Sequence, residues 1–463
     1  MREYFVQLSY LGASVLFILG LRSLTKPDRA RHGMQQAAMG MLLAVCGTLV
    51  NHAIVDYRWI AAGLVVGTLI GYPLGMWVPT TALPQRIAMS LSFGALAATL
   101  VGISEYYTVF HGGEGSIASA RMAALGFEVL LGALTVTGAL VAFGKLQEWL
   151  PGRPMTYRGQ NLVNLVLFAA AVGLLVTVIV SPARGEAFYL MIALAALLGV
   201  LMVLPIGGAD MPVVVALLNS YCGLAASATG FALGNSILII CGALDGASGF
   251  LLSVLMSKAM NRSFANVLFG AFGSPPTAGA AVAGADLAVR SIAPEDAAIQ
   301  LAYAQRVVIV PGYGMAVAQA QHQVRELAEL IEKRGGEVKY AIHPVAGRMP
   351  GHMNVLLAEA NVPYDRLYDM DEINGEFPQT DVALVIGAND VVNPAAREDP
   401  ASPIYGMPIL DVDRAKSVIV LKRGMAAGFA GIENALFLAP RTSMLFGDAK
   451  ASLTTLISEI KNA

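Results

Sequence analysis

Long apolar stretches fill the first 258 residues, and they constrain the fold of this chain more than any other feature. A helix that crosses a bilayer needs roughly 20 mostly apolar residues. Nine stretches approach or exceed this length, at 5–22, 34–51, 59–78, 84–104, 123–144, 162–181, 186–205, 212–233 and 236–257. Only 13% of the residues are charged, whereas soluble domains carry about 25%. The sequence therefore predicts an α-helical, multi-pass membrane domain with nine spans over residues 1–263.

Basic residues are unevenly distributed among the loops that join these stretches. The loops near 22–31, 145–158 and 258–262 each carry two or more Lys or Arg, whereas the alternate loops carry mostly one. The positive-inside rule assigns such basic loops to the cytoplasm. An odd number of spans places the ends of the membrane domain on opposite sides. The charge pattern then predicts a cytoplasmic C-terminal domain.

Net charge and cysteine spacing argue against two kinds of partner. The formal net charge of −2 disfavours nucleic acid, which binds a basic face. The cysteines, Cys46, Cys222 and Cys241, lie within expected spans and lack metal-ligand spacing. We interpret them as small buried side chains and expect no metal site.

Four polar residues within or beside the apolar stretches are candidates for special roles, because ionisable groups are costly in a membrane. Asp210 begins the eighth stretch as an N-cap or a coupling residue. Asn219 lies about 13.5 Å further along that helix, where it makes an inter-helix hydrogen bond or belongs to a proton path. Asp245, near the middle of the ninth stretch, needs a partner, water or a proton. Glu128, about one turn inside the fifth stretch, has the option of snorkelling to the surface.

Small residues predict close packing of the last two spans. Gly223, Ala225 and Ala226 lie on the eighth stretch, and further glycines and alanines surround Asp245 on the ninth. A very short turn at Asn235-Ser236 joins the two stretches. We expect a tight helical hairpin.

The rest of the chain has the pattern of a soluble α/β domain. Residues 264–293 are rich in Gly, Pro and Ala and predict a flexible linker. From 294 to 463, short apolar runs alternate with amphipathic segments, which indicates a Rossmann-like, doubly wound parallel sheet. Strands are expected at 306–310, 337–342, 382–386, 408–411, 417–421 and 443–446, with helices that include 315–333 and 448–461.

The loop after the first expected strand resembles the start of a dinucleotide-binding motif. Gly312-Tyr313-Gly314 follows a buried strand and precedes a helix, and its glycines would let backbone N–H groups approach a pyrophosphate. The third motif position is Val317 rather than Gly or Ala. With this departure, the motif by itself is weak evidence for a dinucleotide site.

The loops after the other strands favour NADP over NAD. Ligands of open parallel sheets bind beyond the carboxyl ends of the strands. The second strand is followed by Arg348 and lacks the acidic residue that an NAD ribose requires. The fifth strand ends in Lys422-Arg423, a cationic pair suited to a 2′-phosphate. Asp448 follows the last strand, where a plain N-cap is an equal alternative.

Two other functions remain open from the residues alone. A degenerate Rossmann domain can serve as a structural or partner-binding module. The second alternative is an NADP(H)-sensing channel or transporter, although no filter loop is evident in the sequence.

Five segments carry a resemblance to a known family. They are Gly207–Ser220 (GGADMPVVVALLNS), Lys258–Ser263 (KAMNRS), Pro311–Gln321 (PGYGMAVAQAQ), His343–Glu359 (HPVAGRMPGHMNVLLAE) and Ile386–Ala395 (IGANDVVNPA). With these segments the chain resembles, over essentially its whole length, the beta subunit of bacterial proton-translocating NAD(P) transhydrogenase.

The resemblance implies a Re/Si-specific enzyme of class EC 7.1.1.1 in the bacterial inner membrane. NADP(H) would bind the C-terminal domain, in an orientation reversed relative to ordinary Rossmann enzymes. NAD(H) would be held by a partner alpha subunit that adds membrane spans, in a dimer of heteromers. Hydride would pass between the nicotinamides, so that NADH, NADP⁺ and an outer proton give NAD⁺, NADPH and an inner proton. No residue of this chain would act as nucleophile or base.

The resemblance also implies specific site residues. NADP contacts are expected at Gly312, Tyr313, Gly314, Val345, Ala346, Gly347, Arg348, Met349, Pro350, Gly387, Ala388, Asn389, Asp390, Val391, Gly406, Met407, Lys422, Arg423, Gly424, Met425, Ala426, Ala427, Gly428, Phe429, Asp448 and Ala449. The resemblance links Asp390 to proton-coupled changes in NADP(H) affinity, and it places Asp210 and Asn219 on the coupling path.

The chain differs from relatives in the family at three positions. Gly424 replaces a serine and Phe429 a tyrosine that many relatives carry. Leu91 stands where some relatives have a titratable histidine. We therefore hypothesise that a partner span supplies that group, with Asp245 as a second candidate for the proton path.

Overall fold

The computed structural model describes most of the chain, and it contains two compact units. The described residues are 2–24, 29–50, 57–79, 82–111, 117–151, 154–207, 210–260, 264, 289–349, 351–400, 402, 404–428, 430 and 432–462. One unit comprises Met1–Gly207 and Val213–Ser253, and the other comprises Gly208–Pro212 and Val254–Ala463. The expected linker at 264–293 lies almost entirely outside the described residues.

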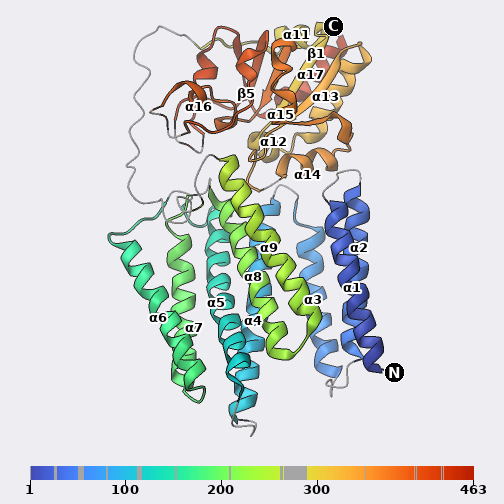
Figure 1. The fold of residues 1–463 in the computed structure, drawn as a ribbon. Helices are drawn as coiled ribbons and strands as arrows, with labels where there is room; N and C mark the ends of the chain where they lie inside the picture. Colours follow the sequence, from blue (N-terminus) through green and yellow to red (C-terminus); the bar gives the residue numbers. More distant parts are fainter. Residues whose placement is uncertain are drawn as a thin grey trace. The chain divides into compact units, whose positions relative to one another are not determined.

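Long helices build the N-terminal unit (Figure 1). They are α1 (Arg2–Leu24), α2 (Ala30–Leu49), α3 (Tyr57–Met76), α4 (Leu83–His111), α5 (Ser119–Leu146), α6 (Gln160–Val180), α7 (Gly185–Val203), α8 (Met211–Leu233) and α9 (Ser236–Ala259). Eight of these described helices are long and apolar enough to cross a membrane. The ninth, α2, carries Arg31 and His32 in its first turn, which lower its hydropathy. The predicted multi-pass class is confirmed, with eight to nine spans.

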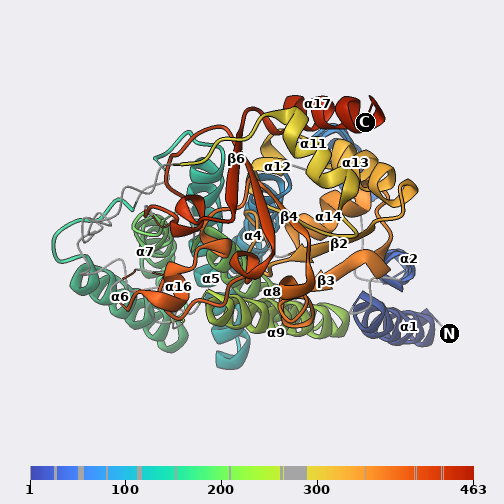
Figure 2. The same ribbon diagram turned by 90° about the horizontal axis from the view of Figure 1, so that it is seen from above.

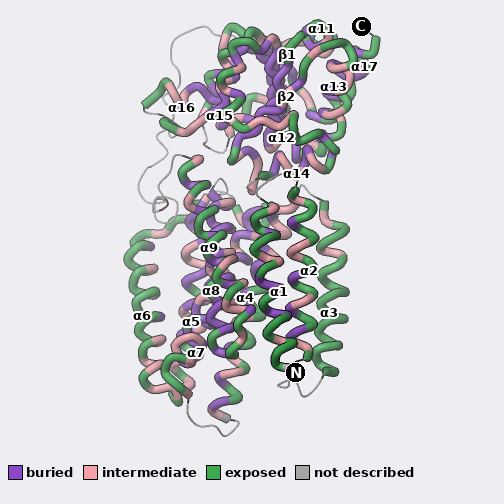
Figure 3. The backbone as a smooth tube through the Cα atoms, turned by 45° about the vertical axis from the view of Figure 1, so that its right-hand side comes forward, coloured by how far each residue is buried: buried purple, intermediate pink, exposed green. Residues whose placement is uncertain are grey.

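The hairpin of α8 and α9 brings two backbones into contact, as expected from its small residues. A Cβ atom added to Gly223 would lie 2.4 Å from Gly246 N, and one added to Gly242 would lie 2.3 Å from Ser227 N. Any side chain at these glycines would force the helices apart. Figure 3 shows the opposite situation at α3, where no residue is buried.

A six-stranded parallel sheet forms the centre of the C-terminal unit. Its strands are β1 (Arg306–Pro311), β2 (Glu337–Ile342), β3 (Leu367–Asp369), β4 (Val382–Ile386), β5 (Ser417–Lys422) and β6 (Thr442–Phe446). The strand order is β3-β2-β1-β4-β5-β6, and every neighbouring pair is parallel. The order reverses direction between β1 and β4, which is where a doubly wound sheet binds its ligand. The predicted Rossmann-like class is confirmed.

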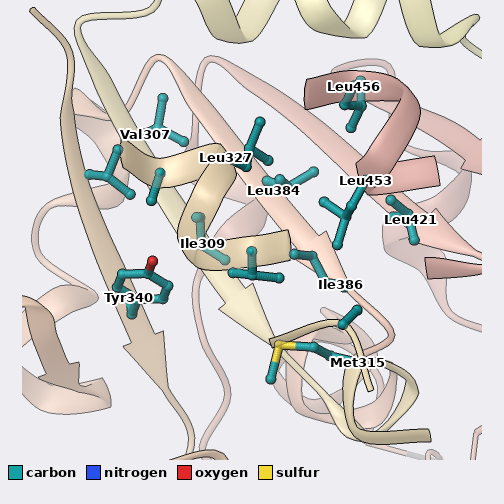
Figure 4. Close-up of a cluster of buried hydrophobic side chains, with 14 of the residues drawn as sticks. Val307, Ile309, Met315, Leu327, Tyr340, Leu384, Ile386, Leu421, Leu453 and Leu456 are labelled. Atoms are coloured by element: carbon teal, nitrogen blue, oxygen red, sulfur yellow. The ribbon is translucent and has the colours of Figure 1, made fainter. Parts of the chain in front are cut away.

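The sheet separates two hydrophobic clusters, and the longer helices of the domain pack against one of them. The longer helices are α11 (Pro294–Tyr303), α13 (Gln321–Lys333), α14 (His352–Glu359) and α17 (Ala449–Asn462). Of these, α11, α13 and α17 gather on one side of the sheet in Figure 2. Their cluster takes Val307 and Ile309 from β1 (Figure 4), whereas Val308 and Val310 belong to the opposite cluster. Because alternate strand residues point to opposite faces, a strand buried on both faces is a continuous apolar run.

Two predicted elements were wrong and one strand was missed. Residues 408–411 form no strand, because Pro408 lacks an N–H group and Leu410 N instead donates to Val391 O at 2.9 Å. The expected helix 315–333 is two helices, α12 (Tyr313–Val317) and α13, separated near Gln319, whose φ is +49°. The missed strand β3 has only three residues and no apolar run.

Candidate functional site

The loops after β1 and β4 touch each other at the point where the strand order reverses. Gly312 N donates to Ile386 O at 2.9 Å, and Gly314 N donates to Gly387 O at 3.0 Å. A Cβ added to Gly314 would lie 2.7 Å from Gly387 Cα. The glycines therefore allow the two loops to pack backbone against backbone. This differs from the predicted role, in which these N–H groups face a pyrophosphate.

A cavity opens at the carboxyl ends of the central strands. Within the sheet domain it is lined by Gly312, Tyr313, Gly314, Val345, Ala346, Gly347, Gly387, Ala388, Asn389, Asp390, Val391, Ile404, Met407, Lys422, Arg423, Ala427, Gly428 and Ala430. A second cavity of about 220 Å³ adjoins it and is lined by Gly314, Val317, Ala318, Gly387, Leu421, Lys422, Arg423, Gly424, Ala426, Ala427, Gly447, Asp448 and Ala449. The two cavities share the loops after β1, β4 and β5.

Asp390 connects the loop after β4 to the loop after β5. It begins the short helix η6 (Asp390–Val392), and its Oδ2 accepts a hydrogen bond from Ala430 N at 3.0 Å. Gly428 packs so closely that an added Cβ would lie 2.4 Å from Asp390 Oδ1. The carboxylate of Asp390 therefore holds Gly428 and Ala430 beside the cavity that both residues line.

Lys422 is held by its own loop, whereas Arg423 is exposed. Lys422 Nζ donates to Ala426 O and lies 4.8 Å from the centre of the Phe437 ring. Burial lowers the pKa of Lys422, and the neighbouring Asp390 carboxylate opposes that change. Arg423 is exposed beside both cavities. Of the predicted cationic pair, Arg423 is thus the more accessible to a phosphate.

Two buried histidines shape the loop after β2. His343 Nδ1 accepts from Val345 N at 3.2 Å, and its Nε2 lies 2.8 Å from Pro408 O. His352 Nδ1 accepts from Arg348 N at 3.1 Å. Burial lowers the pKa of each imidazole to about 4. Both rings are therefore neutral at physiological pH, and they act as braces for the loop backbone.

Most of the predicted nucleotide contacts line the two cavities, with a few exceptions. Arg348 instead stacks on the Tyr313 ring, 4.3 Å from its centre. Met349, Gly406 and Met425 line neither cavity. Pro350 and Phe429 lie outside the described residues.

Several lining residues were not predicted from the sequence. Asp448 was predicted, and it also has the N-cap role that was the alternative for it. Ile404 and Ala430 belong to no motif. Gly447 does carry a signal, since a glycine at a strand end marks a tight turn, here with φ +157°. Asp448 Oδ1 accepts from Lys450 N at 3.0 Å and Ala451 N at 3.2 Å, so it caps α17 as well as lining the second cavity.

Two of the candidate polar residues in the expected membrane domain form a hydrogen bond with each other. Asn219 Nδ2 on α8 donates to Asp245 Oδ1 on α9 at 2.9 Å, so the carboxylate has a partner from the neighbouring helix. Asp210 is buried directly before α8. Leu91 on α4 is buried too, and it lies beside Ser92, whose hydroxyl is 3.4 Å from Val136 O.

Comparison with known proteins places the chain among transhydrogenase sequences. A family model described as NAD(P) transhydrogenase beta subunit matches residues 6–459. A protein named NAD(P) transhydrogenase subunit beta, from Rhodospirillum rubrum, is 50% identical over 448 residues, which are 96% of each chain. The protein of the same name from Rhodospirillum rubrum strain ATCC 11170 shows the same identity and coverage.

Proposed function

Because the chain belongs to the NAD(P) transhydrogenase beta subunit family, we propose that it is the NADP(H)-binding, proton-translocating subunit of that enzyme. Its C-terminal domain binds NADP(H) and exchanges hydride with NAD(H) on the alpha subunit. The membrane domain moves a proton during this exchange. The reaction is the Re/Si-specific one of class EC 7.1.1.1, with NADPH formed as an outer proton enters.

The observation that carries the proposal is the set of glycines that line the cavity at the switch point. Glycines at 312, 314, 387 and 428 line this cavity, so no side chain at these positions stands between the backbone and a ligand. The exposed Arg423 adds positive charge to the lining. A glycine-rich lining with an exposed cation suits a phosphorylated dinucleotide.

The residues proposed to hold NADP(H) lie on the loops after β1, β2, β4, β5 and β6. They are Gly312–Gly314, Val345–Pro350, Gly387–Val391, Gly406, Met407, Lys422–Phe429, Asp448 and Ala449. When bound, NADP(H) supplies the hydride-transfer chemistry. The protein positions the dinucleotide, excludes water and changes its affinity.

Coupling requires that NADP⁺ and NADPH bind differently in two states of the protein. We assign the switch to Asp390, whose carboxylate accepts the hydrogen bond from Ala430 N. A protonated Asp390 is a weaker acceptor, so proton uptake there would loosen the segment 428–430 beside the cavity. The proton path in the membrane would use Asp210, Asn219 and Asp245.

The proposed organisation follows the sequence pattern. The membrane domain spans residues 1–263, the linker 264–293 and the NADP(H) domain 294–463. The enzyme is placed in the bacterial inner membrane with the NADP(H) domain in the cytoplasm, as a dimer of heteromers with the alpha subunit.

The assignment of NADP(H) to this chain is tested by binding to the purified chain without its partner. NADPH and NADH are titrated separately, and bound reduced nucleotide is followed by its fluorescence. We expect tight binding of NADPH and much weaker binding of NADH. Equal affinities, or binding of NADH alone, would contradict the assignment.

The membrane part is tested by changing Asp245 to Asn in the complete enzyme in vesicles. This substitution keeps the shape of the side chain and removes its titratable proton. We expect proton movement per hydride to fall, and unchanged proton movement would remove Asp245 from the path.

A further inference from the structure

Glu128 is a buried carboxyl group that the proposed path does not use. It lies in α5, nine residues from the first residue of the helix, which is about 13.5 Å along the axis. Its exposed fraction is 1%, so the side chain does not snorkel to the surface. Neither carboxyl oxygen has a hydrogen-bond partner within the part of the chain that the structure describes.

Neighbouring helices enclose this carboxyl group and leave it little room. On α4, a Cβ added to Gly102 would lie 3.3 Å from Glu128 Cδ and 3.4 Å from its Oε1. Thr229 on α8 lies within hydrogen-bonding reach of the carboxyl group, and its hydroxyl donates to Ala225 O at 3.0 Å. With its only proton used in this way, the Thr229 oxygen can accept a hydrogen bond but cannot donate one.

The charged groups near Glu128 are already paired with each other. Glu105 on α4 is a second carboxylate close enough to act on Glu128, and it forms an ion pair with Arg121. Arg121 Nε also donates to Ala232 O at 2.9 Å. The one cation of this cluster is therefore engaged by Glu105 and by the last turn of α8, and not by Glu128.

These contacts favour the neutral acid over the carboxylate at Glu128. An ionised carboxylate in an apolar setting needs hydrogen-bond donors or a cation, and the described residues supply neither. A protonated Glu128 can donate its hydrogen to Thr229 Oγ1. The site therefore accommodates a proton on Glu128, and loss of that proton requires a change in packing or the entry of water.

Glu128 lies beside Thr229 of α8, the helix that also carries Asn219 of the proposed path. Asn219 lies nine residues after Asp210, and Thr229 lies ten residues after Asn219, which corresponds to steps of about 13.5 and 15 Å. Glu128 faces the last of these positions, at the end of α8 that the proposed topology places outside.

We propose that Glu128 is the outermost proton-binding group of the membrane domain. Its carboxylate takes a proton from the outer aqueous phase to form the acid, and the acid passes that proton inward toward Asp245. This proposal deepens the proton-translocating function proposed above and rests on it.

The test compares Glu128→Gln, Glu128→Asp and the matched control Glu186→Gln in the complete enzyme. Glu186 is exposed in the first turn of α7, so its loss removes a carboxyl group of the same unit outside the buried site. In proteoliposomes we expect Glu128→Gln to slow proton uptake by at least about tenfold, with partial recovery in Glu128→Asp and no change in Glu186→Gln. Proton uptake at the wild-type rate and ratio in Glu128→Gln would overturn the proposal.

A second measurement separates failure of this proposal from failure of the proposed function. Infrared titration of the purified complex reports the C=O band of a protonated carboxylic acid, whether or not the enzyme pumps. We expect a band that shifts in deuterated water, is lost in Glu128→Gln and is kept in Glu186→Gln. If the wild type exchanges hydride without moving protons, the proposed coupling function is wrong. If the wild type lacks the Glu128 band, the site binds no proton, whatever the outcome of the pumping assay.

Discussion

Gly387 offers the sharpest test of how the two central loops build the cavity. It has φ +64°, a conformation that costs an L-residue roughly 1–2 kcal/mol. A Cβ added there would lie 2.3 Å from Gly314 Cα, whereas ordinary contacts begin near 3.4 Å. Because the atoms that this Cβ would meet are backbone atoms of Gly314, the loops after β1 and β4 would have to separate by about 1 Å.

The expected cost of Gly387→Ala follows from these two effects. Overpacking of this kind adds about 1–3 kcal/mol to the conformational cost, which makes roughly 2–5 kcal/mol in total. This is a large part of the roughly 5–15 kcal/mol that stabilises a typical domain. The separated loops would also weaken NADPH binding by about tenfold or more, since 1.4 kcal/mol corresponds to a factor of ten.

Thermal unfolding in detergent and fluorescence titration with NADPH measure the two effects. The matched control is Gly375→Ala, because a Cβ at Gly375 would meet no atom within 4 Å and the residue lies away from both cavities. We expect a lower unfolding temperature and weaker NADPH binding for Gly387→Ala alone. A Gly387→Ala variant that melts and binds like the control would refute the reasoning about loop contact.

Three further predictions test the charges and the buried histidines of the C-terminal domain. Arg423→Ala should weaken NADPH binding by about 1.5–3 kcal/mol and leave NADH binding unchanged, while Lys416→Ala, which removes a cation paired with Asp381 at 2.8 Å, should alter neither titration. The neutral imidazoles of His343 and His352, with pKa values lowered from 6.5 to about 4, stabilise the folded state above pH 6.5. That stability should be lost as pH falls toward 4, by roughly 3 kcal/mol per imidazole. Hydrogen exchange of residues 343–352 measures this loss of protection. If the rings were already protonated in the folded state, protection would not change with pH in this way. Arg397→Met breaks the ion pairs to Asp411 and Asp413. It should lower the free energy of unfolding by about 1 kcal/mol, because the pairs are partly exposed, and chemical denaturation against wild type measures this change. A loss above about 3 kcal/mol would mean that the network behaves as fully buried.

The architecture was predictable where burial leaves a periodic pattern in the sequence. Strands such as β1 and β4 are buried on both faces and appear as continuous apolar runs, and the long helices of the N-terminal unit are predominantly apolar. The run 408–411 was misassigned because its buried residues resemble a strand, although their backbone bonds to the loop after β4. Strand β3 was missed because three residues carry too little pattern.

The candidate site was predictable in outline, because parallel strands bring their following loops to one edge of the sheet. Contacts that depend on packing between distant segments were not. The hydrogen bond between Asn219 and Asp245 requires the register of the α8–α9 hairpin. The burial of Glu128 requires α4 and α8 to pack against α5, and no local sequence pattern predicts that packing.

The central claim is that hydride exchange between the two nucleotides is coupled to proton movement, and it is tested directly in inverted membrane vesicles. The vesicles contain this chain with its alpha subunit and receive NADH deuterated at the transferred position, NADP⁺ and a proton-sensitive dye. We predict that deuterium appears in NADPH rather than in water, and that an imposed proton gradient speeds this transfer until an uncoupler removes the gradient. Deuterium lost to water would contradict direct transfer, and a rate indifferent to the gradient and to the uncoupler would contradict the coupling.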